Sequence, residues 1–388
     1  MSSTHPGLAG GPVYLDYNGT TPVDPTVVDA MLPALTTSFG NPSSSHAYGS
    51  AAHALVETAR AQVGSLINAA AGRVVFTGSG SEADALAIKG VALARRTGHA
   101  RAHVVTQVTE HPAVLATCAD LSELHGVDVT ALPVDGSGLV DPDAVADAIT
   151  DQTVLVSVMH ANNETGTLQP ITEIAEVAHA RGVLVHCDAA QSVGKIPVDV
   201  AALGVDLLTI VGHKMYAPKG IAALYVRHDL ALRPLVGGGG QESGLRAGTE
   251  NVPHIVGLGQ AAQLAAQALD AGEAARLTAL RDRLEQRLRE LLPGRIHLNG
   301  HPSRRLPNTL NVSIDRAPAL AVLAAAPALA ASAGSACHAG HDTPSAVLTA
   351  MGVSDDRALT AIRFSLGRWT TWQDVERAAT VLAQAAPS

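Results

Sequence analysis

Short runs of β-branched and other apolar residues alternate with stretches of helical period between about residue 70 and residue 230. This alternation is typical of a largely parallel sheet whose strands are joined by crossover helices. Several of the runs are apolar almost throughout, as expected of strands covered on both faces. The predicted strands are Val74–Thr77, His103–Gln107, Val127–Leu132, Thr153–Met159, Val183–Cys187, Leu207–Val211 and Ile221–Val226. The pattern predicts one large α/β domain with a seven-stranded, mostly parallel sheet.

The pattern changes after this region and indicates a second, smaller α+β domain. A long helix is predicted over Ala261–Leu292, because leucines recur every three or four residues along one face. The other elements predicted here are strands at Ile296–Leu298, Thr309–Ile314 and Ile362–Leu366 and a packed helix within Ala317–Ala333.

The domains are expected to divide the chain unevenly. Residues 14–262 would form the large domain, and residues 1–13 and 263–388 the small one. The first twenty residues are expected to pack near the small domain, which would also carry the loop 332–345.

The composition argues against several classes of protein. The 388 residues include 26 Lys and Arg against 35 Asp and Glu, a net charge of −9, which is opposite to the basic surface of a nucleic-acid binder. No run approaches the roughly 18 consecutive apolar residues that a membrane helix requires. The first residues lack the basic and apolar segments of a signal peptide, so we expect a cytoplasmic protein. The three cysteines include no C-x-x-C pair and predict neither a disulfide scaffold nor a four-cysteine zinc site.

Three loops follow predicted strands of the large domain, at the edge where open α/β sheets bind ligands. Gly78–Glu82 is glycine-rich and opens a helix whose backbone N–H groups can bind an anion, although an ordinary turn capped by Ser81 is the simpler interpretation. Asp188 can pair with a bound cation or cap a helix, and Lys214 is either solvated or a nucleophilic amine. Together, an anion site, a carboxylate and a lysine match the phosphate, the pyridine nitrogen and the aldehyde of pyridoxal phosphate.

These loops lie within longer motifs that run from Val13 to about Glu376. The motifs are YLDYNGTTPVDP at 14–25, GNPSSSH at 40–46, TEHPAVL at 109–115, MHANNETGTLQPI at 159–171, HCDAAQSVGK at 186–195, GHKMYAPKGIAALYVR at 212–227, GLRAGTENVP at 244–253, GSAC at 334–337 and IRFSLGR at 362–368. In these motifs the chain closely resembles the cysteine desulfurases and selenocysteine lyases of the fold-type I, class V aminotransferase superfamily. The resemblance implies the α/β fold of the fold-type I transferases and pyridoxal 5′-phosphate as the cofactor.

The resemblance also assigns roles around the cofactor ring. Lys214 would bind the aldehyde covalently, and Asp188 would pair with the pyridinium nitrogen. His111 would stack on the ring and could also shuttle protons, because imidazole titrates near neutrality. Gln191 and Asn163 would approach the phenolic oxygen.

The phosphate and the substrate are assigned in the same way. Gly80, Ser81 and His213 would bind the phosphate together with Thr249 of a second subunit, so a homodimer is expected. Arg363 is the candidate for binding the substrate carboxylate, because a guanidinium group can hold a carboxylate with two hydrogen bonds, and Asn163 would also contact the substrate. One departure from the family pattern is Val211, where a serine is usual.

Cys337 is the nucleophile that the resemblance implies. Its Gly- and Ser-containing loop is expected to be mobile, because sulfur must be collected at the cofactor and delivered elsewhere. Cys118 and Cys187 lie in apolar sequence and are expected to be buried and inert. A metal site formed by Cys337, His338 and His341 is the alternative, but this loop offers at most three ligands.

The expected reaction converts L-cysteine to L-alanine and leaves the sulfur on Cys337 as a persulfide for an acceptor protein. Selenocysteine lyase is the nearest alternative, because His338 and the wording around Lys214 also resemble that enzyme. Aminotransferase or β-lyase activity and a non-catalytic partner in a sulfur-transfer complex are the remaining alternatives. The presence of Cys337 in its family loop argues against the first of these, and the intact set Lys214, Asp188, His111 and Cys337 against the second.

Overall fold

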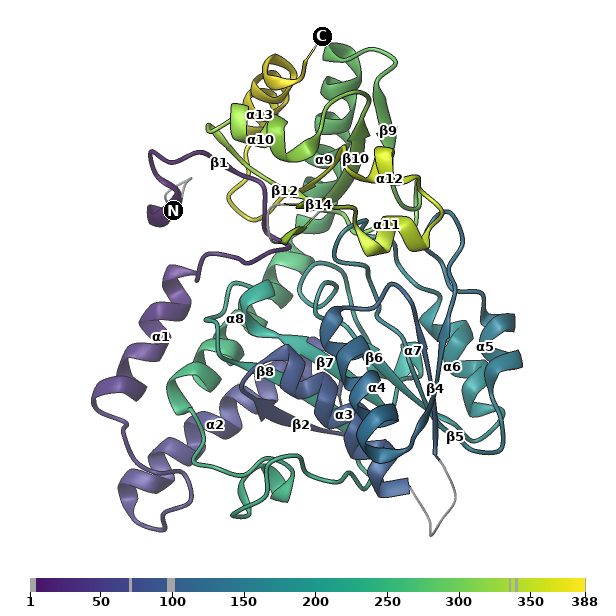
Figure 1. The fold of residues 1–388 in the computed structure, drawn as a ribbon. Helices are drawn as coiled ribbons and strands as arrows, with labels where there is room; N and C mark the ends of the chain where they lie inside the picture. Colours follow the sequence, from purple (N-terminus) through teal and green to yellow (C-terminus); the bar gives the residue numbers. More distant parts are fainter. Residues whose placement is uncertain (1–4, 70–71, 96–101, 335, 339–340, 388) are drawn as a thin grey trace.

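The computed structural model describes residues 5–69, 72–95, 102–334, 336–338 and 341–387, and the side chains of residues 335–342 lie outside this description. A seven-stranded sheet forms its centre (Figure 1). The strands are β2 (Gly72–Thr77), β3 (His103–Gln107), β4 (Asp128–Leu132), β5 (Thr153–Ser157), β6 (Leu184–Asp188), β7 (Leu207–Val211) and β8 (Ala222–Arg227), in the order β2-β8-β7-β6-β5-β3-β4. In this sheet β8 alone runs opposite to the other six strands, so the prediction of seven mostly parallel strands is confirmed.

Helices cover both faces of this sheet, which explains why its central strands are apolar along their whole length. They are α1 (Pro25–Thr36), α2 (Ala47–Leu66), α3 (Gly80–Arg95), α4 (Pro112–His125), α5 (Pro142–Ala148), α6 (Ile171–His179), α7 (Val200–Leu203) and α8 (Val252–Asp270). Side chains of α3 and α4 pack with the strands in one buried cluster, and side chains of α2, α6 and α8 pack with them in another. Buried strands between two apolar layers leave the ends of the strands as the place where polar groups can gather.

A second unit lies beside the first in Figure 1, around a four-stranded antiparallel sheet in the order β12-β15-β10-β9. Its strands are β9 (Ile296–Leu298), β10 (Thr309–Ile314), β12 (Ser332–Ala333) and β15 (Ala361–Ser365). Its helices are α9 (Glu273–Leu291), α10 (Ala319–Ala325), α11 (Ala346–Ala350), α12 (Asp355–Ala358) and α13 (Trp372–Ala385). The leucine stripe of α9 packs with β10, β15 and α13 in a separate core.

The N-terminal segment joins this second unit, as expected. Strand β1 (Val13–Tyr14) pairs in parallel with β11 (Leu329–Ala330). The predicted domain boundary after residue 262 falls inside α8, whose Ala261, Ala262 and Ala265 all belong to the core beside the large sheet. The division into two domains stays a prediction.

One prediction about helices is wrong, and another is confirmed over part of its range. The helix predicted over Ala261–Leu292 is two helices, α8 and α9, because the chain turns at Gly272, whose φ of 81° is left-handed and suits glycine. The helix predicted within 317–333 covers only Ala319–Ala325, and β11 and β12 follow it. Pro327 disfavours helical backbone at the residue before it, and pairing with β1 and β15 supplies hydrogen bonds that a helix would have made internally.

The segment that carries Cys337 forms a short hairpin of β13 (Ala336–His338) and β14 (His341–Thr343). Its side chains from 335 to 342 lie outside the described residues, and the prediction that it is mobile is not tested. Among the helices that are described, none is both long enough and apolar enough to cross a membrane.

Candidate functional site

A cavity of about 420 Å³ lies where the predicted loops converge. Nine of the predicted site residues line it, namely Gly80, Ser81, His111, Asn163, Asp188, Gln191, His213, Lys214 and Arg363. They come from the ends of several strands of the large sheet and, for Arg363, from β15 of the second sheet. Of the other two, Thr249 is exposed and is not one of the described lining residues, and the side chain of Cys337 is outside the described residues.

Asp188 is the last residue of β6, so the buried strand carries its carboxyl group to the edge of the sheet. Its Oδ1 accepts a hydrogen bond of 2.9 Å from the backbone N–H of Ala190. Burial raises the pKa of Asp188, while that hydrogen bond and the charges of His111 and Lys214 oppose the rise. The carboxyl group is buried yet faces a cavity, so a bound cation there would be strongly stabilised.

Lys214 lies in a short 3-10 turn, η2 (Gly212–Lys214), directly after β7. Its Nζ donates hydrogen bonds to the backbone carbonyl oxygens of Asn18 at 2.6 Å and of Gly19 at 2.8 Å. Burial and the charge of Arg363 lower the pKa of Lys214 to about 8. Near neutral pH this amine can therefore lose its proton and act as a nucleophile.

His111 caps the N-terminus of α4, where its Nδ1 accepts a hydrogen bond of 3.1 Å from the N–H of Ala113. Since Nδ1 is the acceptor, the proton of the neutral ring belongs on Nε2. Desolvation and the charge of Lys214 lower the pKa of His111, although Asp188 raises it. A neutral ring at the cavity wall is suited to stacking on a flat ligand.

The glycine-rich loop leads into α3, which begins at Gly80. The helix is capped by Ser79, whose Oγ accepts a hydrogen bond of 3.1 Å from the N–H of Glu82, and not by Ser81 as the simpler interpretation held. A Cβ added at Gly80 would lie 2.6 Å from Cγ2 of Val211, so this position excludes a side chain. Ser81 is thereby left at the cavity, beside a helix N-terminus that favours an anion.

Asn18 and Lys195 hold the polar groups around Gln191 and Asn163, and sequence reasoning gave neither of them a role. Nζ of Lys195 donates hydrogen bonds of 2.8 Å to Oδ1 of Asn18 and to Oε1 of Gln191. Asn18 in turn donates through Nδ2 to the backbone oxygen of Asn163 at 3.2 Å. Burial lowers the pKa of Lys195 well below its usual range, with Lys214 and Arg363 acting in the same direction. The only sequence feature that could have pointed to Lys195 was its position four residues after Gln191 in the same motif.

Two buried acids near Asp188 were also missed. Oε1 of Glu110 accepts hydrogen bonds from Nε2 of Gln107 at 2.9 Å and from the N–H of Met159 at 2.7 Å, and burial raises the pKa of Glu110 to about 8. Asp84 lines the cavity, and burial together with the charge of Asp188 raises its pKa well above the usual range. Both lie in helical or loop sequence where an acid would ordinarily be solvated, so no sequence pattern marked them.

Arg363 projects from β15 to the cavity and is held by two groups. Its Nη2 donates to Oδ1 of Asp16 at 2.7 Å, and its Nη1 donates to the backbone oxygen of Asn163 at 3.0 Å. Asp16 was not predicted as part of the site. The guanidinium group is oriented before any ligand arrives, and an incoming carboxylate would compete with Asp16 for it.

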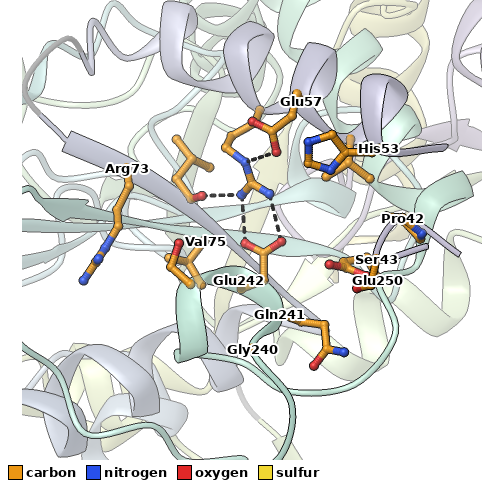
Figure 2. Close-up of a pocket in the computed structure, with 14 residues that line it drawn as sticks. Pro42, Ser43, His53, Glu57, Arg73, Val75, Gly240, Gln241, Glu242 and Glu250 are labelled. Carbon is orange, nitrogen blue, oxygen red and sulfur yellow. Dashed lines mark hydrogen bonds and ion pairs between the residues drawn. The ribbon is translucent and has the colours of Figure 1, made fainter. Parts of the chain in front are cut away.

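The segment before Thr249 is fixed to the edge of the sheet by an ion pair between the buried Glu242 and the partly buried Arg60. Figure 2 shows Glu242, whose carboxylate accepts hydrogen bonds from Nη1 and Nη2 of Arg60 at 2.8 and 3.0 Å. The same carboxylate also accepts a hydrogen bond of 2.8 Å from the N–H of Phe76. This pair lies in a hollow of about 650 Å³. A second ion pair of 2.9 Å, between Arg246 and Glu82, ties the same segment to α3 and the glycine-rich loop.

The remaining predictions about cysteines and metals have mixed outcomes. Cys118 and Cys187 are both buried, and burial raises the pKa of each thiol, as expected of inert cysteines. Among the described residues, no group of three or more His, Cys, Asp and Glu side chains could hold a metal ion. The alternative site of Cys337, His338 and His341 involves side chains outside that set.

Comparisons with known proteins point to one family. The aminotransferase class-V family matches residues 13–378. A protein of Anaeromyxobacter dehalogenans named cysteine desulfurase IscS is 49% identical over 371 residues, which cover 95% of this chain and 90% of that protein. A solved NifS-like protein has a TM-score of 0.88 and 34% identity, covering 96% of this chain and 98% of its own. The structure titled SspA in complex with cysteine has a TM-score of 0.79 and 37% identity, covering 91% of this chain and 98% of its own. These names support the main expectation over selenocysteine lyase, and the chain belongs to the class-V aminotransferase family, among its cysteine desulfurases.

Proposed function

We propose that this protein uses pyridoxal 5′-phosphate to move the sulfur of L-cysteine onto Cys337, from which an acceptor protein takes it. The observation that carries the proposal is the meeting of Asp188, Lys214 and His111 at one cavity in a chain of this family. The residues fit the cofactor. Asp188 offers a buried carboxyl group for a protonated ring nitrogen, and Gly80 leaves a space that a Cβ would close.

The cofactor, when bound, supplies an electron sink that stabilises negative charge on the α-carbon of an amino acid. Asp188 would hold the proton on the ring nitrogen. Lys214 would bind the aldehyde carbon and, with a pKa of about 8, could take up and return the α-proton near neutral pH. His111 would cover one face of the ring, with the proton on Nε2.

The other cavity residues would position the cofactor and the substrate. Gly80, Ser81 and His213 would hold the phosphate, and Gln191 and Asn163 would contact the phenolic oxygen. Arg363 would bind the substrate carboxylate by exchanging its hydrogen bond to Asp16 for one to the ligand.

The sulfur step balances without an added oxidant or reductant. The thiolate of Cys337 attacks the sulfur of the substrate, an S–S bond forms, and the C–S bond breaks. Its electron pair stays with the substrate carbon, which takes up a proton and leaves as L-alanine. Cys337 keeps the second sulfur as a persulfide.

The experiment measures both products at once. Purified protein incubated with L-cysteine alone is expected to gain one sulfur atom on the peptide that contains Cys337 and to release L-alanine in equal amount. Intact-mass and peptide mass spectrometry detect the sulfur. Cys337→Ala should bind L-cysteine, as an absorbance change of the cofactor, but form no persulfide. If the wild type forms no persulfide and has a much higher kcat/KM for selenocysteine, the enzyme is a lyase instead.

We also propose that the working unit is a homodimer, because large apolar side chains are exposed on α1, at the start of α2 and between these helices. Leu32, Leu35, Phe39 and Tyr48 are 49 to 68% exposed, and the rings of Phe39 and Tyr48 stack at 5.3 Å. Exposed apolar residues gathered on one segment are typical of an interface between subunits. Thr249 is itself exposed, as a residue that serves a neighbouring subunit would be.

Light scattering tests the dimer. Wild-type protein is expected to have twice the mass of one chain, and Leu35→Glu is expected to shift it towards the monomer. Because Thr249 would reach the phosphate of the partner, the same variant should bind the cofactor more weakly. A fully active monomer at nanomolar concentration would contradict the proposal.

A further inference from the structure

Glu164 lies where the loop that carries Asn163 meets the two ends of the segment that carries Cys337, residues 335–344. It follows Asn163 in the chain, and its backbone oxygen accepts a hydrogen bond of 3.2 Å from Nδ2 of Asn311. Its N–H donates to Oδ1 of Asn162 at 2.9 Å. The backbone of Glu164 is therefore tied to both units of the structure, while its side chain plays no part in the function proposed above.

The carboxylate of Glu164 accepts a hydrogen bond of 2.5 Å from Oγ of Ser345, which is buried. Ser345 is the N-cap of α11, and its Oγ also accepts from the N–H of Leu348 at 3.2 Å. One hydroxyl group thus starts the helix after the hairpin and, by donating its proton, joins that helix to Glu164. Burial raises the pKa of Glu164, and the hydrogen bond from Ser345 and the charge of Arg363 oppose the rise.

The other end of the hairpin reaches the same carboxylate. Ser332 and Ala333 of β12 pair with Arg363 and Ile362 of β15, and the N–H of Gly334 donates to the backbone oxygen of Ala361 at 3.1 Å. A Cβ added at Gly334 would lie 3.5 Å from Oε2 of Glu164 and 3.6 Å from Cβ of Ser345. The two ends of segment 335–344 therefore converge on one side chain.

We propose that Glu164 is a positioning residue that fastens the base of the Cys337 segment to the loop carrying Asn163, and so sets where the thiol meets the substrate. The inference rests on the proposed function, because it assigns Glu164 to the sulfur-transfer step. The hydrogen bond from Ser345 to Glu164 holds the C-terminal end of the segment, and the pairing of β12 with β15 holds the other end. Both attachments lie next to residues that line the cavity, Asn163 and Arg363.

Ser345→Asp is the decisive variant, because aspartate still caps α11 but places a second negative charge against Glu164. In the double variant Ser345→Asp with Glu164→Gln, the new amide at 164 can donate a hydrogen bond to the new carboxylate at 345. Glu164→Ala removes the attachment altogether. Glu285→Ala, which removes a partly buried carboxylate on α9 that pairs with Arg305 and not with Ser345, is the matched control.

The first measurement needs no turnover. Hydrogen exchange of peptide 332–345 and alkylation of Cys337 are expected to be about tenfold faster in Ser345→Asp and Glu164→Ala, the size of effect expected for losing one hydrogen bond to a charged group. The double variant should return towards wild type. Alkylation reports Cys337 because Cys118 and Cys187 are buried.

The second measurement separates positioning from substrate binding. Persulfide formation on Cys337 should slow about tenfold in kcat for Ser345→Asp, with KM for L-cysteine unchanged and recovery in the double variant. A raised KM with unchanged kcat would mean that Glu164 acts through Arg363, and the proposal would be wrong. Unchanged exchange and labelling in Ser345→Asp would also overturn it.

The two proposals fail separately. If wild-type protein forms no persulfide, the proposed function fails, and the exchange and labelling results still decide whether Glu164 holds the segment. If Glu164→Ala does not fold, Ser345→Asp and its rescue by Glu164→Gln decide the outcome alone.

Discussion

Nζ of Lys195 donates a hydrogen bond of 2.8 Å to Oε1 of Gln191, and this contact decides which way the glutamine amide faces. Because the oxygen is taken by the lysine, the amide nitrogen is the end left to donate, and it does so to the backbone oxygen of Asn18 at 3.2 Å. A buried lysine behind the cavity thus gives a neighbouring amide a fixed donor direction, which a ligand oxygen at the cavity can use.

Lys195→Met tests this relationship. Methionine fills a similar volume but cannot donate, so the amide of Gln191 loses its fixed direction, and cofactor affinity is expected to fall about tenfold. Titration of apoprotein with pyridoxal phosphate measures the affinity. Lys89→Met, which removes a lysine from the surface of α3, is the control and should leave the affinity unchanged. Equal affinities in the two variants would show that Lys195 does not orient Gln191.

The low pKa of Lys214 predicts how cofactor attachment depends on pH. Only the neutral amine attacks an aldehyde, so the rate of attachment to apoprotein should rise with pH and level off above about 8. Asp16 raises the pKa of Lys214, so Asp16→Asn should move the midpoint to lower pH. Absorbance followed after mixing at each pH gives the rates. A midpoint near the ordinary lysine value of roughly 10.4 would contradict the prediction.

The buried carboxyl group of Glu110 predicts a pH dependence of stability. Its pKa is raised from 4.5 to about 8, so between these values the unfolded chain is ionised at this group and the folded chain is not. The contribution of Glu110 to the free energy of unfolding is therefore constant below pH 4.5, becomes more destabilising as pH rises to about 8, and is constant again above that pH.

Glu110→Gln removes the titration and keeps an acceptor for Gln107 and Met159. As pH rises from 4.5 to about 8, the variant should therefore become more stable relative to the wild type. At about pH 8 the gain in its relative free energy of unfolding should reach a few kcal/mol. Urea unfolding at several pH values measures the difference. A constant difference across the window would mean that Glu110 is ionised in the folded protein.

The contact between Gly80 and Val211 predicts a rescue. Gly80→Ala places a Cβ 2.6 Å from Cγ2 of Val211, so the start of α3 must shift. Because overpacking of this kind costs roughly 1–3 kcal/mol, the phosphate should bind about tenfold more weakly or worse. Adding Val211→Ala removes the opposing methyl groups and should restore much of the affinity. Cofactor titration measures both variants, and failure of the second substitution to improve binding would point to a need for glycine at 80 on other grounds.

The sequence by itself determined the large sheet and the position of most of its ligand groups. The apolar runs that became β6 and β7 predict buried strands, and a carboxylate or lysine directly after such a strand must come out at the edge of the sheet. The motifs then assigned roles to Asp188, Lys214 and His111, and all three line one cavity. The positions of these residues could be predicted because period and chain order are local properties, while their roles stay predictions.

The tertiary structure decided what a local pattern cannot carry. Asn18 and Lys195 are 177 residues apart and Glu164 and Ser345 are 181 residues apart, yet each pair shares a hydrogen bond. Pairing with β1 also overrode a helical sequence pattern at β11. Contacts of this kind join segments that are distant in the chain, and their stability comes from burial and hydrogen bonds that exist only once the chain has folded.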